Sequence, residues 1–257
     1  MKITILGCGS ATGTPSVGCG WGDLDQNNPK NSRLRPSILV ENGNTRILVD
    51  TSPDLRRQLL NADVDRLDAV LYTHAHADHL HGIDDLRQIN RSMNAAIDIY
   101  GDEATIAEIS ERFGYVLVPL APDAKSYFKP TLNPHTIHEG DTLTIGDVDI
   151  NVFVQDHGYG KTLGFRFGPI AYSTDVVELP ENAFDVLDGV DTWIVGTLID
   201  HPHPTHAHVD KALDWMQRVG PRRGVLTHLG FSLDFDVLKN SLPDHIEPAF
   251  DGMILEA

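Results

Sequence analysis

The chain alternates between short apolar runs and longer stretches in which apolar residues recur at helical spacing. In its first half, apolar runs predict strands at 2–6, 36–41, 45–49, 68–73 and 97–100. An Asn42-Gly43 pair predicts a tight turn that joins the second and third of these strands. Helices are predicted from Ser52-Pro53-Asp54 onward, with Ser52 as the cap, and at 80–91 and 103–113.

The second half of the chain begins after an irregular stretch, 114–134, that contains four prolines. Beyond it, strands are predicted at 135–138, 142–145, 148–155, 163–168, 170–173, 192–198, 223–227 and 252–256, and helices at 181–188 and 209–219. Two strand-rich halves with helices, approximately 1–130 and 131–257, predict an α+β fold in which two sheets face each other and helices cover the outside. We expect residues 1–257 to form a single domain.

Composition and net charge favour a soluble globular protein and disfavour nucleic-acid binding. A hydrophobic content of 41% and a charged content of 22% are typical of soluble globular proteins. The net charge of −17 disfavours nucleic acid as a partner, because electrostatic binding to phosphate needs clustered Lys and Arg. The apolar run before Gly7 is too short for a signal-peptide core, and Cys8 and Cys19 make no disulfide framework. We therefore expect a cytoplasmic protein that does not associate with membranes.

Four metal-capable side chains lie within six residues, directly after the predicted strand 68–73. They are His74, His76, Asp78 and His79. On an extended backbone His74 and His76 point to one side, whereas Asp78 and His79 can face a second point once a helix begins. A lone histidine is more often an ordinary surface or core residue, but a cluster of this density favours a metal site. The junction between this strand and the following loop could thus provide ligands for two neighbouring metals.

The pattern H-x-H-x-D-H resembles the signature of the metallo-β-lactamase superfamily, whose members take further ligands from later strand ends. Residues of the expected types follow later apolar runs in the expected order: His157, Asp175 and His228. The resemblance implies that His74, His76 and His157 hold one metal, that Asp78, His79 and His228 hold the other, and that Asp175 bridges them. It also implies a four-layer αββα sandwich. The implied cofactors are two divalent metal ions, Zn²⁺ or Mn²⁺, since the ligands are nitrogen and oxygen only.

The opening stretch Gly7 to Pro15 reads GCGSATGTP and resembles the phosphoribosyl cyclic phosphodiesterase branch of that superfamily. It is not G-x-G-x-x-G, and no helix is predicted after it, so a dinucleotide-binding loop is disfavoured. In this branch a loop matching 16–35 carries three cysteines that hold a structural zinc with a later histidine. Here only Cys19 is present and Phe231 stands at the histidine position, so we predict that this zinc site is absent.

Three other residues have a plain alternative to a functional role. The resemblance implies that Asp50 sits behind the metals and orients their ligands, although an Asp at a strand end is also a common turn residue. Arg33 and Arg35 could bind phosphate, but solvated loop arginines are the preferred interpretation.

A second histidine cluster lies at 201–208. Phosphodiesterases of the superfamily carry a histidine shortly before the helix that precedes the final ligand strand, which implies that His206 is the general acid, with His208 as the second candidate. Structural or surface roles are expected for His201 and His203. The implied catalytic residues are His206, Asp78 and Asp175.

These residues together predict a binuclear metal-dependent hydrolase. The favoured activity is a phosphodiesterase that cleaves a small cyclic phosphate or nucleotide-like phosphodiester by attack of a metal-bridging hydroxide. The alternatives are a tRNA 3′-processing-type endoribonuclease, which the negative charge disfavours, and a thioester or lactam hydrolase, which would need no acid at His206. A redox di-iron site would need Glu in place of His76. The expected partner is a small-molecule phosphodiester, and a homodimer, the natural substrate and the metal identity stay open.

Overall fold

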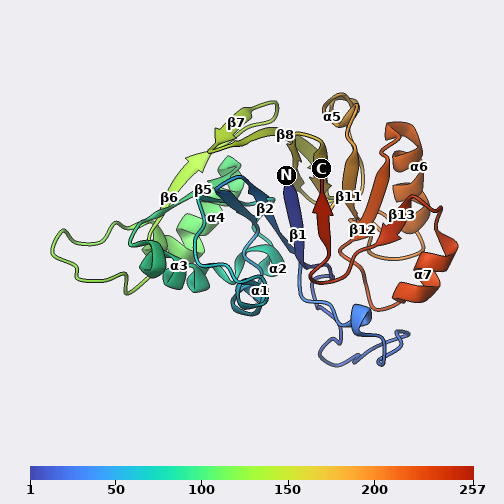
Figure 1. Ribbon diagram of the computed structural model, residues 1–257, viewed down its shortest axis with the longest axis horizontal. Helices are drawn as coiled ribbons and strands as arrows, with labels where there is room; N and C mark the ends of the chain where they lie inside the picture. Colours follow the sequence, from blue (N-terminus) through green and yellow to red (C-terminus); the bar gives the residue numbers. More distant parts are fainter.

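The computed structural model describes residues 1–257, and its fourteen strands form two mixed seven-stranded sheets that lie face to face (Figure 1). The first sheet has the order β14-β1-β2-β3-β4-β5-β6. Its strands are β1 (Lys2–Gly7), β2 (Ser37–Asn42), β3 (Thr45–Val49), β4 (Ala69–Leu71), β5 (Ile97–Gly101), β6 (Leu132–Thr136) and β14 (Ile254–Glu256). The last strand pairs antiparallel with β1, which brings the two chain ends side by side.

The second sheet has the order β13-β12-β11-β10-β9-β8-β7. Its strands are β7 (Thr142–Ile145), β8 (Val148–Asp156), β9 (Lys161–Phe167), β10 (Ile170–Ser173), β11 (Thr192–Gly196), β12 (Arg223–Thr227) and β13 (Ile246–Pro248). In both sheets one part is antiparallel and the other parallel: β3 to β6 run parallel in the first, and β10 to β13 in the second. The carboxyl ends of neighbouring parallel strands lie at the same edge of a sheet. In α/β folds the loops at this edge commonly carry the ligand-binding residues.

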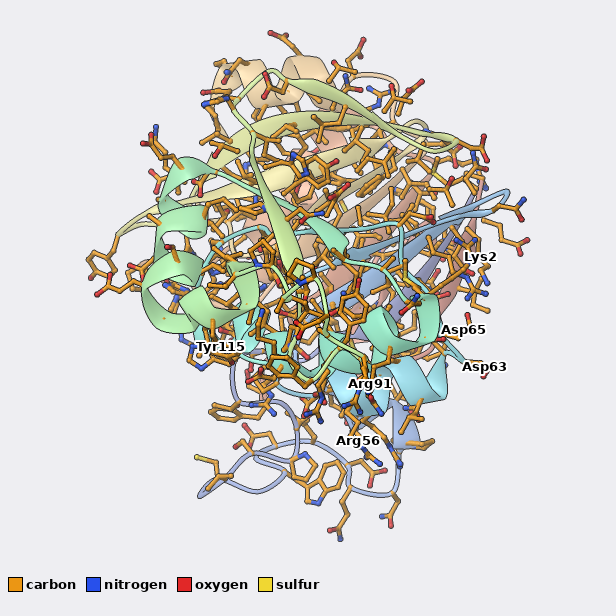
Figure 2. The ribbon with its side chains drawn as sticks, turned by 90° about the vertical axis from the view of Figure 1, so that its left-hand side faces the viewer. Lys2, Arg56, Asp63, Asp65, Arg91 and Tyr115 are labelled. Carbon is orange, nitrogen blue, oxygen red and sulfur yellow. The ribbon has the colours of Figure 1, made fainter.

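Helices cover the outer face of each sheet. Apolar residues of α1 (Leu55–Asn61), α3 (Leu86–Met93) and α4 (Glu103–Phe113) pack on the first sheet. Those of α5 (Glu181–Leu187), α6 (Val209–Val219) and α7 (Phe235–Ser241) pack on the second. The opposite helix faces are polar, and Figure 2 shows Arg56, Asp63 and Arg91 at the surface on the side of α1 and α3. None of the helices has both the length and the apolar character needed to cross a membrane.

The largest apolar cluster lies between the sheets and holds 22 buried residues drawn from both of them. Ile3, Ile38 and Ile47 come from the first sheet, and Phe165 and Ile194 from the second; each is fully buried. Burial of this shared apolar surface drives the sheets together. The predicted αββα sandwich is therefore confirmed, and we propose from the shared core that residues 1–257 form one domain.

Several predicted elements have different boundaries or a different form. The predicted helix 80–91 is divided into α2 (Ala77–Leu80), a 3-10 turn at Ile83–Asp85 and α3. Ser52 does not cap α1: its hydroxyl donates to Gln58, and Asp54 occupies the cap position. The stretch 114–134, predicted to be irregular, contains a 3-10 turn at Gly114–Leu117 and the start of β6, which joins the first sheet.

Two elements, α7 and β13, were missed entirely. Each has only a short apolar pattern of its own, because α7 spans seven residues and β13 three. Their structure depends on packing: Phe235 and Leu238 of α7 are buried, and β13 pairs in parallel with β12.

Candidate metal centre

The predicted ligand side chains follow the carboxyl ends of strands from both sheets. His74 follows β4 in the first sheet, and His157, Asp175 and His228 follow β8, β10 and β12 in the second. His76 stands at the N-cap of α2, whose first turn carries Asp78 and His79. The two facing sheets thus direct seven side chains into one cluster, in which Asp78 meets His228 across 150 residues of sequence.

The cluster consists of two groups of four that share one carboxylate. The first group is His74, His76, His157 and Asp175, and the second is Asp78, His79, Asp175 and His228. Within each group the candidate ligand atoms lie within 4.8 Å of one another. The structure therefore brings seven of the residues named in the sequence analysis together in these two groups. All of them are buried except His76, which is exposed at the mouth of the site.

Asp175 lies between the two groups and turns one carboxylate oxygen toward each. Its Oδ2 is 3.7 Å from Nε2 of His74 and 3.7 Å from Nε2 of His157. Its Oδ1 is 3.2 Å from Nε2 of His79 and 3.1 Å from Nε2 of His228. Asp78 faces only the second group, with Oδ2 3.2 Å from Nε2 of His79 and 3.4 Å from Nε2 of His228.

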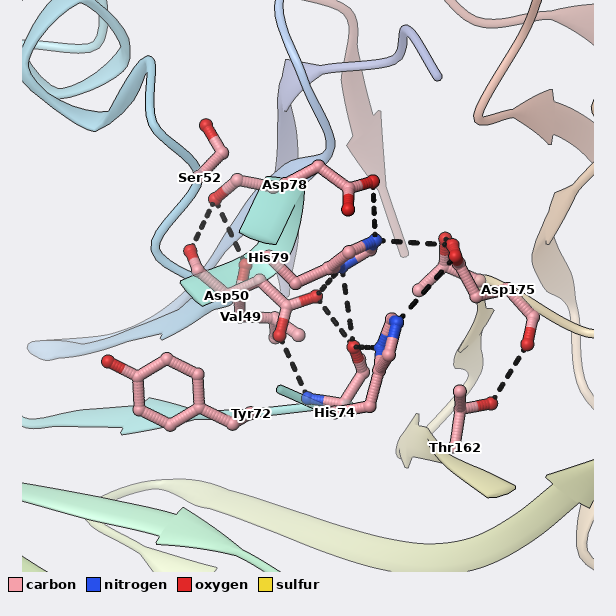
Figure 3. A network of polar contacts seen from close by, with 12 residues as sticks. Val49, Asp50, Ser52, Tyr72, His74, Asp78, His79, Thr162 and Asp175 are labelled. Carbon is pink, nitrogen blue, oxygen red and sulfur yellow. Dashed lines mark hydrogen bonds and ion pairs between the residues drawn. The ribbon is translucent and has the colours of Figure 1, made fainter. Parts of the chain in front are cut away.

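The outer nitrogen of three rings is held by a partner outside the cluster. Nδ1 of His79 contacts Oδ2 of Asp50 at 2.6 Å (Figure 3). Nδ1 of His74 lies 3.0 Å from the Thr73 hydroxyl, and Nδ1 of His157 lies 2.7 Å from the Thr205 carbonyl oxygen. Such contacts fix ring orientation and leave Nε2 free to bind. The sequence pointed to this role for Asp50 but not for Thr73 or Thr205.

Asp50 is itself rigidly held. Its Oδ1 accepts from the Thr73 backbone N–H at 2.8 Å, and its Oδ2 accepts from the Thr73 hydroxyl at 2.8 Å (Figure 3). With His79, these contacts occupy both carboxylate oxygens, and Asp50 is fully buried. The interpretation of Asp50 as a mere turn residue is therefore wrong.

Three residues of the site adopt left-handed backbone conformations that non-glycine residues rarely take. The φ angles are 65° for Asp50, 49° for Asp175 and 57° for His228. Each of these residues stands directly after a strand or within two residues of its end, so the turn redirects its side chain into the cluster. Strain of this kind persists only where the surrounding structure enforces it, and it gathers at functional sites.

The polar atoms at the centre of the cluster fit a bound cation. Nε2 of His74 and Nε2 of His79 are buried and have no hydrogen-bond partner. Buried polar atoms are normally hydrogen-bonded, so two such nitrogens that converge on carboxylates fit a bound divalent cation. Nitrogen and carboxylate donors of this kind bind first-row divalent ions.

The charges in the cluster lead to the same conclusion. Burial lowers the pKa of His79, but the carboxylates of Asp175, Asp78 and Asp50 outweigh it and raise that pKa well above its usual value. Positive charge is thus favoured at the position where Nε2 of His79 meets two carboxylates. In contrast, burial and the neighbouring His79 lower the pKa of His74, which keeps that imidazole neutral as a metal ligand requires.

His206 is the histidine of the second cluster that reaches this centre. Its ring lies 4.8 Å from the His157 ring and 5.0 Å from the His228 ring, and its Nδ1 is 4.0 Å from Oδ2 of Asp175. His208 instead forms the N-cap of α6 and does not line the cleft. Burial and the nearby His228 lower the pKa of His206 to about 3.

A cleft of about 520 Å³ opens over the cluster and exposes it to solvent. Its lining includes Arg112 of α4 and the exposed residues Tyr159 in the β8–β9 turn and Lys161 at the start of β9, none of which the sequence analysis singled out. These residues have no sequence motif of their own, and only the fold brings them to the metal ligands. Ala11, from the glycine-rich stretch 7–15, also lines the cleft.

The glycine-rich stretch 7–15 passes close to another backbone segment. A Cβ at Gly7 would lie 2.1 Å from the Arg35 carbonyl oxygen, so only glycine allows the two segments to pass this closely. The chain then pairs with the residue after His228, because Ser10 N–H donates to the Leu229 carbonyl at 3.2 Å.

The two arginines of the 16–35 loop are not solvated. Arg33 is 2% exposed and donates to the carbonyls of Gly230 and Leu233, and Arg35 forms an ion pair with Asp54 at 2.7 Å. The preferred interpretation of both as solvated residues is therefore wrong, because their loop packs against residues distant in sequence. Cys19 is exposed on this loop.

Comparison with known proteins agrees with this geometry. Residues 45–229 match the family model described as the beta-lactamase superfamily domain. The chain belongs to the metallo-β-lactamase superfamily. Within the superfamily, a crystal structure described as a new diphosphatase from the PhnP family is similar over 100% of this chain and 97% of that chain, with 30% identity and a TM-score of 0.91. This superfamily chain lies in the PhnP-like branch.

Two curated relatives are similar in sequence. An octanoyltransferase of Porphyromonas gingivalis is 31% identical over 98% of this chain and 51% of its own length. A ribonuclease Z of a Bradyrhizobium species is 34% identical over 54% of this chain and 46% of its own length. The chain therefore spans about half the length of the curated relatives it matches.

Proposed function

We propose that this protein is a metal-dependent hydrolase, namely a binuclear phosphodiesterase that acts on a small phosphodiester. The observation that carries the proposal is the position of Asp175, whose two carboxylate oxygens face two separate sets of ligand atoms at 3.1–3.7 Å. A carboxylate shared in this way suits two neighbouring cations, and paired cations are a common solution for displacement at phosphorus.

In this proposal the seven clustered residues divide as the sequence predicted. His74, His76 and His157 hold one ion, Asp78, His79 and His228 hold the second, and Asp175 contacts both. Divalent ions held there would lower the pKa of a coordinated water and neutralise charge on the phosphate oxygens. The chain's own contribution is to fix the ligand rings through Asp50, Thr73 and Thr205, so that no reorganisation is needed when the substrate arrives.

His206 has the position required of a general acid. It lies beside the centre, within 5.0 Å ring to ring of His157 and of His228, and it lines the open cleft. Its pKa of about 3 means that it is neutral at pH 7 before substrate binds. An anionic phosphodiester next to the ring raises that pKa, so that the imidazolium forms together with the substrate complex and can protonate the leaving oxygen.

The form of the cleft supports a small substrate. A volume of about 520 Å³ lies within the range of small-molecule sites. Most of its lining residues are polar, which suits a charged substrate better than an acyl chain. The diphosphatase activity of the similar PhnP-family protein supports attack at phosphorus, and it extends the candidate substrates from phosphodiesters to diphosphates.

A nuclease of the ribonuclease Z type is the second candidate, because a ribonuclease Z is 34% identical to about half of this chain. The net charge of −17 opposes it, since phosphate contacts dominate affinity for nucleic acid. Only one arginine and one lysine line the cleft. The arginine, Arg112, already forms an ion pair with Glu108 at 2.6 Å, which leaves few cationic groups for an RNA backbone.

The test combines a metal count with hydrolysis of bis(p-nitrophenyl) phosphate before and after chelation. We expect two ions per chain. Chelation should lower the rate of diester hydrolysis more than 100-fold, and addition of Zn²⁺ or Mn²⁺ should restore it. A precursor tRNA and a thioester serve as comparison substrates. Faster cleavage of either one by the metal-loaded protein, with little diester hydrolysis, would contradict the proposal.

A further inference from the structure

The turn between β8 and β9 and the strand residue directly after it carry two exposed side chains next to a metal-ligand candidate. The turn comprises residues 157–160, Lys161 is the first residue of β9, and His157, Tyr159 and Lys161 all line the cleft. Tyr159 is 93% exposed, an unusual state for an aromatic ring that would normally be at least partly buried.

Lys161 forms no ion pair, although Asp156 stands opposite it in the β8–β9 register and the chain carries 37 acidic residues and only 20 basic ones. Its side chain forms none of the ion pairs or hydrogen bonds in the structure. Arg112, on the opposite wall of the cleft, differs: it pairs with Glu108 and donates to the Ala75 carbonyl at 3.0 Å. Lys161 is therefore the cationic group in the cleft that remains available to an anionic ligand.

The turn is fixed against the segment that carries His206. Gly158 has a φ of 82°, and a Cβ at this position would lie 2.5 Å from the Pro204 carbonyl oxygen. The ring of His157 adds a contact at 2.7 Å to the Thr205 carbonyl. Tyr159 thus lies in, and Lys161 directly after, a turn that packs directly before His206. A group bound there lies on the side where His206 would protonate the leaving oxygen.

From this arrangement we propose that Tyr159 and Lys161 form a subsite for a nucleotide leaving group. The nucleobase stacks on the Tyr159 ring, and the nucleotide phosphate contacts the Lys161 ammonium. The inference rests on the proposed function and names its substrate class. In the reaction, a bond forms between the water oxygen and the attacked phosphorus. The bond from that phosphorus to the nucleotide's phosphate oxygen breaks, and this oxygen takes the proton from His206. The proton that the attacking water loses passes to solvent, from which His206 regains one.

Binding to the metal-loaded protein, measured by calorimetry, separates the two contacts without turnover. Tyr159→Leu should weaken AMP and adenosine about tenfold and leave ribose 5-phosphate unchanged, whereas Tyr159→Phe should keep wild-type affinity. Lys161→Met should weaken AMP about tenfold and leave adenosine unchanged. Phe128→Leu and Lys125→Met are matched controls, because both residues are exposed and lie outside the cleft lining.

Turnover of ADP-ribose in ¹⁸O-labelled water tests which side of the substrate leaves. We expect unlabelled AMP and labelled ribose 5-phosphate, with KM raised about tenfold in Tyr159→Leu and in Lys161→Met. Hydrolysis of ADP-ribose and of bis(p-nitrophenyl) phosphate should change less than twofold in the control variants Phe128→Leu and Lys125→Met.

The outcomes distinguish the subsite from the catalytic activity. Metal-dependent diester hydrolysis with equal ADP-ribose kinetics in all variants would overturn the subsite and leave the proposed function standing. Label in AMP would place the nucleotide on the wrong side and would also overturn it. AMP affinity that is lost on chelation but kept in Lys161→Met would assign the phosphate to the metals instead of Lys161. Absence of any diester hydrolysis would refute the proposed function, and the subsite with it.

Discussion

Two buried polar clusters lie a short distance apart in this protein, and they are built in opposite ways. In the metal centre, ring nitrogens and carboxylate oxygens face one another, and Nε2 of His74 and of His79 have no hydrogen-bond partner. In the second cluster, which we call the loop anchor (Asn31, Arg33 and Asp251), the polar groups face the chain. The Arg33 guanidinium donates to Gly230, Leu233 and Asn31, and Asp251 accepts from the N–H groups of Cys8 and Leu34.

The difference separates a binding site from a structural one. A buried polar group that is paired within the chain stabilises a particular backbone arrangement, here the attachment of the 16–35 loop to the loop after β12. Buried groups that converge without partners are costly unless something else is bound between them. The loop anchor should therefore affect stability, and the metal centre should affect metal content and activity.

The largest effect is expected from Asp175→Ala. Removing the carboxylate that faces both ligand groups should lower the metal content and reduce diester hydrolysis to near background. Metal analysis and kinetics on the same preparation test this. The control is Asp65→Ala, a surface residue whose side chain is 76% exposed. An active Asp175→Ala protein that keeps two metals would rule out the bridging position.

His206→Ala should reduce the rate by about 100- to 10,000-fold for substrates with an alkoxide leaving group, which needs a proton as it departs. For bis(p-nitrophenyl) phosphate the loss should be much smaller, because the departing phenolate is stable without protonation. Metal content should not change. Equal losses on both substrates would assign His206 to binding or structure instead of proton transfer.

In the loop anchor, Arg33→Met should lower the free energy of unfolding by about 3 kcal/mol, because three buried acceptors lose their donor. The activity per folded molecule should stay near wild type. Urea denaturation and kinetics at saturating metal measure the two quantities, with the exposed Arg56→Met as the matched control. Loss of metal in Arg33→Met would show that the two clusters are not independent.

The last expected effect concerns the pH dependence of stability. Burial raises the pKa of Asp251 from 3.8 to about 6. As the pH rises from about 4 to 6, the unfolded chain releases this proton while the folded chain keeps it, so the folded state loses up to about 3 kcal/mol of stability. Asp251→Asn cannot titrate and should lack this loss. Denaturation curves between pH 4 and pH 7 that run parallel for the two proteins would contradict the assignment.

Much of the fold was readable from local sequence. Periodicity located most strands, because apolar runs bounded by turn residues are a local signal, and the turn at Asn42-Gly43 joins β2 and β3 as predicted. It failed for α7 and β13, whose few residues are structured by their neighbours. It also predicted one helix at 80–91, where the chain forms the end of α2, a 3-10 turn and most of α3. Helical spacing of apolar residues alone does not show where a helix is interrupted.

The sequence by itself determined the type and order of the metal-site residues, because the spacing from His74 to His79 and the single residues after later strands form a local pattern. Only the tertiary structure decided which atoms meet. The division of Asp175 between two groups, the left-handed turns at Asp175 and His228, and the burial of Arg33 depend on contacts between distant segments. The same is true of Lys161, which became a candidate only when the fold placed it in the cleft without an ion pair. Such contacts are set by the packing of two sheets against each other, and no local pattern of residues encodes them.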